Sequence, residues 1–129
     1  MDKKATPQLF IALFLSIALG FLVWSFSKVF TGNDEPWDSY SSYYYIGLFL
    51  AALVPGLIGN LKQFWIWPIG VCAGELLFVV VKSLSESNPE LLVMLPMTIL
   101  FTLVGSLPAW IGSLVGAVLA FLIKRKEAK

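Results

Sequence analysis

The chain has 129 residues, of which 58% are hydrophobic and 13% are charged, and its net charge is +1. Soluble domains carry about 25% charged residues, so the composition excludes an ordinary soluble fold, and the small net charge gives no field to attract nucleic acid. The chain has no histidine and one cysteine, Cys72, which excludes Ser–His and Cys–His nucleophilic catalysis, an intramolecular disulfide and a zinc site of several thiols. No cofactor is expected.

Four long apolar stretches occupy nearly the whole chain. Each is about as long as a helix that crosses the roughly 30 Å hydrocarbon core of a bilayer, which takes about 20 residues. The sequence therefore predicts an all-α integral membrane protein, a single domain formed by a four-transmembrane-helix bundle. The predicted helices span about 8–30, 43–59, 65–82 and 91–123.

The first apolar stretch follows Lys3 and Lys4 and at first resembles a signal peptide. It continues to Phe30, however, beyond the 7–15 apolar residues of a typical signal core. Thr6 and Pro7 provide a capping hydroxyl and a proline suited to the first helical position. We expect a first helix that is retained.

The segment between the first two helices carries three carboxylates, Asp34, Glu35 and Asp38. They lack the fixed spacing and the additional oxygen ligands of a calcium-binding loop, so a solvated loop is expected and no metal site. The second and third helices are joined by a tight turn at 60–63.

The fourth stretch, 91–123, is too long for one simple crossing. Its 33 residues would measure about 50 Å as a continuous helix, and it contains Pro96 and Pro108, each of which removes a backbone donor and favours a kink. A single long helix bent at Pro108 is the favoured interpretation. The alternatives are a short segment at 91–104 that enters the membrane and returns before a crossing from Pro108, and two full crossings.

Basic residues predict the orientation. Taking the two termini and the turn at 60–63 as one side, that side holds seven of the nine lysines and arginines, whereas the other has only Lys28 and Lys82. Cytoplasmic loops are enriched in lysine and arginine, so both termini are expected in the cytoplasm, with the protein in the cell inner (cytoplasmic) membrane. The seven basic residues of the first side are Lys3, Lys4, Lys62, Lys124, Arg125, Lys126 and Lys129.

The tryptophans and tyrosines near the helix ends are expected at the membrane–water boundaries.

Glu75 is the most suggestive single residue because it lies near the middle of the third predicted helix. A carboxylate at that depth costs about 3 kcal/mol on insertion scales, and removal from water favours its protonated form. Candidate polar neighbours at similar depth are Ser106, Thr102 and Ser16. Three interpretations remain: a proton or cation site, a polar contact with a partner, or a neutral acid that fixes the register of the helices.

Small residues recur every fourth position at Gly112, Gly116 and Ala120. Further rows occur in the first helix (Ala12, Ser16 and Gly20) and in the third (Gly70 and Gly74). Such rows let helix backbones approach closely in lipid. They serve either packing within the bundle or an interface with a partner, and the row at Gly112 is the better candidate for an interface.

These patterns favour a non-enzymatic accessory, assembly or regulatory component that acts through helix–helix contacts. Its expected partners are the lipid bilayer and either another membrane protein or further copies of the chain, with no nucleic acid. One alternative is a small proton- or cation-coupled transporter or channel that uses Glu75. A membrane enzyme or lipid-handling protein, restricted to Glu75 and to Asp, Ser and Thr groups, is the other.

Overall fold

The structure is a computed structural model that describes residues 5–32, 42–87 and 89–129, and the regular elements in these ranges are all helices. A short 3₁₀ helix, Leu61–Gln63, lies between α3 and α4. The α-helices are α1 (Ala5–Ser25), α2 (Ser27–Thr31), α3 (Tyr43–Ile58), α4 (Ile66–Ser85), α5 (Pro89–Val93), α6 (Leu95–Gly105) and α7 (Leu107–Glu127).

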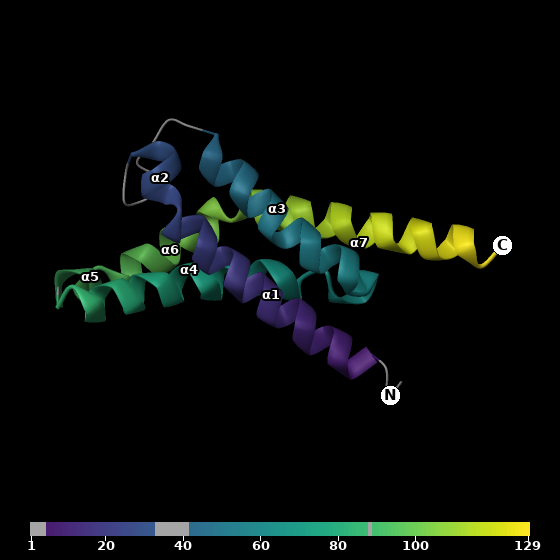
Figure 1. Ribbon diagram of the computed structural model, residues 1–129, viewed down its shortest axis with the longest axis horizontal. Helices are drawn as coiled ribbons and strands as arrows, with labels where there is room; N and C mark the ends of the chain where they lie inside the picture. The colour runs from purple at the N-terminus through teal and green to yellow at the C-terminus, as the bar shows by residue number, and fades with distance from the viewer. Residues whose placement is uncertain (1–4, 33–41, 88) are drawn as a thin grey trace.

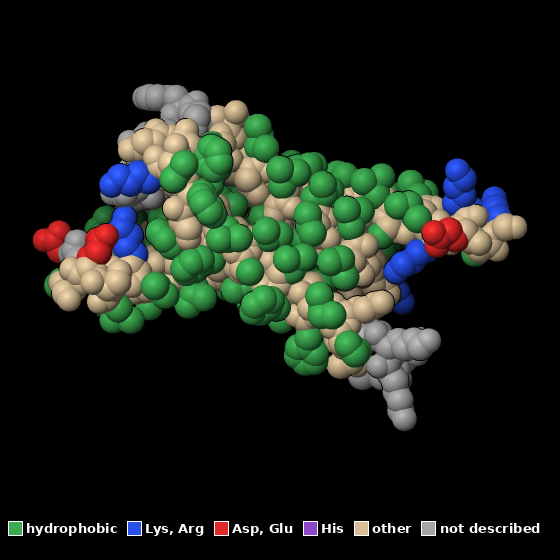
Figure 2. All heavy atoms as spheres, viewed as in Figure 1, with side chains coloured by type: hydrophobic (Ala, Val, Ile, Leu, Met, Phe, Trp, Pro, Cys, Tyr) green, Lys and Arg blue, Asp and Glu red, His purple; other side chains and the backbone are tan. Residues whose placement is uncertain are grey.

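Three of these helices, α1, α4 and α7, are long and apolar enough to cross a membrane, and α3 and α6 are shorter apolar helices. On the face drawn in Figure 2, hydrophobic side chains cover the long middle of the molecule and charged side chains lie toward its two ends. This is the distribution of a protein whose middle faces hydrocarbon. The prediction of an all-α membrane protein is confirmed at this level.

Helices α1 and α4 run in the same direction and pack closely through small residues (Figure 1). A Cβ added at Gly20 would overlap the backbone of Val71, and one added at Gly74 would overlap the carbonyl oxygen of Ile17. Beyond these contacts the Phe78 ring lies 6.0 Å from the Trp24 ring, between centroids. Close approach of backbones at small residues is how helices associate in lipid.

Helices α3 and α7 form a second parallel pair. A Cβ at Gly112 would overlap the carbonyl oxygen of Phe49, and one at Gly116 would overlap that of Leu53. From the other side, Gly56 of α3 lies against the α7 backbone at Ser113. The fold therefore consists of two closely packed helix pairs, α1 with α4 and α3 with α7.

The fourth apolar stretch is three helices and not the single long helix that the sequence favours. A single residue separates α5 from α6 (Met94) and α6 from α7 (Ser106), and Pro96 and Pro108 lie in the first turns of α6 and α7. Proline is tolerated there because the first backbone N–H groups of a helix have no acceptor within that helix. The predicted first helix is likewise divided, because α1 ends at Ser25 and α2 begins at Ser27.

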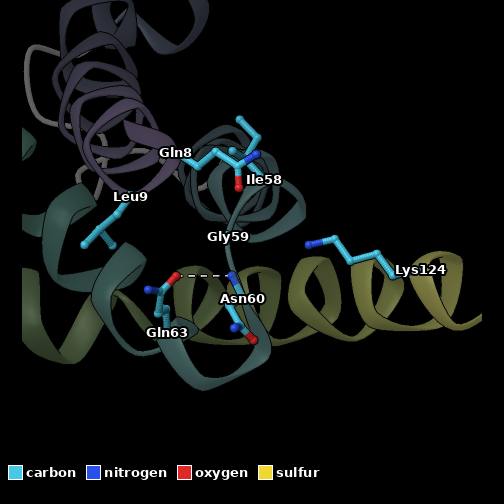
Figure 3. A pocket seen from close by; sticks show the side chains of 7 residues that line it. All are labelled: Gln8, Leu9, Ile58, Gly59, Asn60, Gln63 and Lys124. Carbon is cyan, nitrogen blue, oxygen red and sulfur yellow. Dashed lines mark hydrogen bonds between the residues drawn. The ribbon is translucent and has the colours of Figure 1, made fainter. Parts of the chain in front are cut away.

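The start of α1, the turn after α3 and the end of α7 meet at one end of the molecule, around a cavity of about 100 Å³. Figure 3 shows Gln8, Asn60 and Lys124 around it. In the turn, the Asn60 backbone N–H donates to Gln63 Oε1 (3.3 Å), and the Lys62 N–H donates to Asn60 Oδ1 (3.4 Å). Residues far apart in the sequence are thus brought to the same end.

Several aromatic residues near the helix ends are buried inside the protein. Trp67 is fully buried, and its ring lies where a Cβ on Gly59 would be. Trp24 and Tyr44 are also buried. Their apolar rings fill space between helices, which amphipathic aromatic side chains do as readily as they line an interface.

Candidate functional site

Glu75 lies at the tenth position of the 20-residue helix α4, and its side chain is fully buried, with 0% exposed. It shares the inward face of α4 with Val71, Cys72 and Val79, which lie three or four residues away. Side chains at this spacing share one face of a helix. The carboxyl group is thus held in the interior by the same helix face that forms part of the apolar core.

Tyr44 is the hydrogen-bond partner of Glu75. Its hydroxyl donates to Glu75 Oε2 at 3.1 Å, and the phenol ring is 3% exposed. Tyr44 belongs to the first turn of α3, so the bond joins the α3–α7 pair to the α1–α4 pair. The second carboxyl oxygen, Oε1, is buried without a hydrogen-bond partner among the described residues.

Other polar groups surround this bond. The Trp24 indole, from α1, lies against both Tyr44 and Glu75. Cys72, one turn before Glu75, places its Sγ 4.0 Å from the carbonyl oxygen of Thr102. A Cβ on Gly105 would lie 3.6 Å from the Tyr44 hydroxyl. The break between α6 and α7 is therefore beside the site, which draws side chains from four segments of the chain.

Two of the predicted neighbours, Ser106 and Thr102, are buried around this site but are not the primary partners of Glu75. Ser106, at the junction of α6 and α7, lies beside Cys72 and donates its hydroxyl to the carbonyl oxygen of Leu103 (2.8 Å). Thr102 is the one buried residue of α6, and its Oγ1 has no hydrogen-bond partner in the described part of the chain.

Ser16, the third predicted neighbour, takes part in packing. It is buried against Gly70 and donates to the carbonyl oxygen of Leu13 (2.7 Å). Gly70 precedes Glu75 by five residues, about 7.5 Å along the helix axis. The structure thus separates the packing row of α1 from the polar site.

The row Gly112, Gly116 and Ala120 is buried on α7 and faces inward. Its two glycines lie against the α3 backbone at Phe49 and Leu53. Within the chain, these two glycines therefore take part in the close packing of α7 against α3.

Sequence reasoning missed Tyr44 and Trp24 as partners of Glu75. A partial signal exists for Tyr44: it shares a four-residue spacing with the small residues Ala52 and Gly56, a pattern typical of packed helix faces in lipid. No comparable pattern indicates which inward residue of another helix it would meet.

The arrangement can carry out limited chemistry: one carboxyl group and one phenol share a hydrogen bond in a buried, largely apolar setting. Among the described residues no group of three or more His, Cys, Asp or Glu side chains could hold a metal ion. The acidic residues Asp34, Glu35 and Asp38 lie outside the described residues. The site can fix two helix pairs in register or hold a proton.

Comparison with models of protein families, with curated proteins and with solved structures finds no match to this chain.

Proposed function

We propose that the chain is a non-enzymatic membrane component, with an accessory, assembly or regulatory role exerted through helix–helix contacts in the bilayer. The proposal is supported by a contrast between the interior of the protein, where the ionisable group is enclosed, and its exterior, where an apolar helix is exposed. The main ionisable group of the interior, Glu75, is closed off and bonded to Tyr44, whereas helix α6 is apolar and exposed along nearly its whole length.

Four crossings are part of this proposal. Because α1 and α4 are parallel, the chain must return between them, and α3 is the apolar helix that makes this return. Its 16 residues measure about 24 Å, which is short for a crossing but within reach of a locally thinned bilayer. The fourth crossing would be made by α6 and α7 in succession.

The proposed orientation has both termini in the cytoplasm of a cell with the protein in its inner membrane. Lys62 and the basic end of α7 lie toward the same end of the molecule, and Lys28 and Lys82 lie at the other. The larger number of basic residues at the first end supports a cytoplasmic placement. Labelling of cysteines introduced at Lys62 and at Ser85, from each side of the membrane, measures this orientation.

Helix α6 is the proposed contact surface. Thr102 is its one buried residue, while Met97, Leu100 and Val104 are exposed on a common stripe at spacings of three and four. In lipid such a stripe needs no burial from water, so a partner would be held by close packing of side chains. A partner helix laid along this stripe would replace lipid as its neighbour.

Affinity purification in mild detergent tests the proposal. We expect a membrane protein to copurify in stoichiometric amount with the wild-type chain and to be lost from the variant Leu100→Ala/Val104→Ala. The matched control is Leu119→Ala/Leu122→Ala, which makes the same kind of change on exposed positions of α7. A wild-type chain that purifies alone, or a partner retained equally by both variants, contradicts the proposal.

A second candidate function is proton-coupled transport, and one observation favours it. The bond between Tyr44 and Glu75 joins the two helix pairs beside the α6–α7 break, and Glu75 Oε1 is buried without a hydrogen-bond partner among the described residues. Discontinuous helices beside a buried ionisable group recur in transporters. If binding or release of a proton by Glu75 broke this hydrogen bond, the α1–α4 pair would be freed to move relative to the α3–α7 pair.

Proton flux in liposomes that contain the purified chain tests this second function. If it holds, an imposed pH gradient dissipates faster than in empty liposomes, and Glu75→Gln lowers the protein-dependent rate at least tenfold because an amide cannot carry the proton. Glu86→Gln, at the exposed end of the same helix, is the control and retains the flux. Equal rates for wild type and Glu75→Gln exclude Glu75 as a proton carrier.

A further inference from the structure

A second cavity, of about 330 Å³, lies between the ends of α1 and α4, at the opposite end of the molecule from the cavity in Figure 3. Its lining includes the aromatic side chains of Trp24 and Phe78, one from each helix. Val81 adds a further apolar side chain that is also exposed on the outer surface of α4. Part of the cavity wall is therefore apolar, and at Val81 it adjoins the surface that would face lipid.

Two lysines line the same cavity. Lys28 follows Trp24 by four residues, and Lys82 follows Phe78 by four residues, so the parallel packing of the two segments brings both side chains to the wall of one cavity. Each ammonium group carries a positive charge and three hydrogen-bond donors. Lysines at the ends of apolar helices extend toward the level of the lipid headgroups.

The remaining polar groups of the cavity are acceptors. Glu86 contributes a carboxylate. The hydroxyls of Ser25 and Ser85 donate to backbone carbonyl oxygens of their own helices, those of Phe21 (2.8 Å) and Lys82 (3.0 Å), so toward the cavity they offer oxygen lone pairs. The cavity wall thus combines two lysines, hydrogen-bond acceptors and apolar side chains.

We propose that this cavity binds the headgroup of a phospholipid whose phosphate interacts with Lys28 and Lys82. Glu86 accepts a hydrogen bond from an ammonium or hydroxyl group at the end of the headgroup, and an acyl chain lies over Val81. The position supports a lipid as the source of the phosphate, because the apolar parts of α1 and α4 both end at this cavity. The inference goes beyond the proposed function and is independent of the role of Glu75.

Native mass spectrometry of the purified chain with added lipid tests the proposal. We expect phosphatidylethanolamine or phosphatidylglycerol to bind at least tenfold more tightly to the wild type than to Lys28→Gln/Lys82→Gln. The matched control is Lys62→Gln/Lys124→Gln, which removes two lysines from the other end and retains wild-type binding. Size-exclusion profiles of both variants establish that they remain folded.

Binding of a second lipid and competition by inorganic phosphate identify the ligand. Phosphatidylcholine, whose headgroup has no hydrogen-bond donor, is expected to bind at least threefold more weakly than phosphatidylethanolamine, and Glu86→Gln is expected to narrow this difference. Lipid binding that is unchanged in Lys28→Gln/Lys82→Gln, or lost equally in the control, overturns the proposal. Inorganic phosphate that displaces the lipid at equal concentration would assign the cavity to a free anion and overturn the lipid assignment.

Discussion

Replacing Gly74 by leucine is expected to prevent the chain from reaching its folded state in detergent. A Cβ at this position would overlap the carbonyl oxygen of Ile17 and lie 2.8 Å from the backbone nitrogen of Phe21. Both contacts are to the backbone of α1, so no rotation of a side chain relieves them, and α1 and α4 must separate. Even alanine at this position should lower the free energy of unfolding by about 3 kcal/mol, the upper end of the usual cost of overpacking.

Ala73→Leu is the matched control, because Ala73 is the preceding residue of the same helix and its side chain is exposed. We expect this variant to elute from size exclusion as the wild type does and to unfold at the same fraction of denaturing detergent. Gly74→Leu should elute as an aggregate or show much reduced helical circular dichroism. A monodisperse, fully helical Gly74→Leu protein would show that α1 and α4 do not pack in this register.

Glu75→Leu and Tyr44→Phe are each expected to destabilise the protein, and the two together to restore most of the loss. Glu75→Leu leaves the Tyr44 hydroxyl buried without the acceptor that it has at 3.1 Å, and Tyr44→Phe leaves the Glu75 carboxyl without its donor. A buried polar group that loses its partner costs about 1–3 kcal/mol, whereas replacing both partners by apolar groups can be nearly neutral. The energies of hydrogen bonds between helices in membranes lie at the lower end of this range. We therefore expect each single variant to lower the free energy of unfolding by about 1–2 kcal/mol.

Equilibrium unfolding in mixed micelles, with increasing SDS, measures all four members of this double-mutant cycle. Recovery in the double variant would mean that the bond fixes the register of the two helix pairs and that an apolar contact replaces it. Additive losses would mean that Glu75 and Tyr44 contribute independently, which contradicts the geometry described here. Ser25→Ala serves as a control, because that hydroxyl bonds within its own helix and joins no helices.

The double variant Glu75→Leu/Tyr44→Phe also distinguishes the two proposed functions. A double variant that is stable and still binds the partner would restrict Glu75 to a structural role and favour contacts made through α6. A double variant that is stable but has lost proton flux would favour transport, because its helices would still be held together while the exchangeable proton would be gone.

The sequence by itself determined the class of the protein and the position of Glu75 near the middle of the third helix. Apolar stretches of about 20 residues predict membrane-crossing helices because a bilayer requires every backbone polar group to be bonded within the helix. The third predicted helix, 65–82, is close to the observed α4, Ile66–Ser85. Proline positions indicated that 91–123 could be interrupted, but a proline can bend a helix or begin a new one, so the sequence alone did not distinguish one kinked helix from α6 and α7.

Only the tertiary structure decided which inward faces meet. Tyr44 and Glu75 lie on the inward faces of their own helices, but spacing along the sequence contains no information on the rotation and depth of one helix against another. Those are set by backbone contacts at Gly20, Gly74 and Gly112, where close approach is possible. Since the partner of Glu75 and the cavity at Lys28 both depend on these contacts between distant segments, neither could be derived from local patterns.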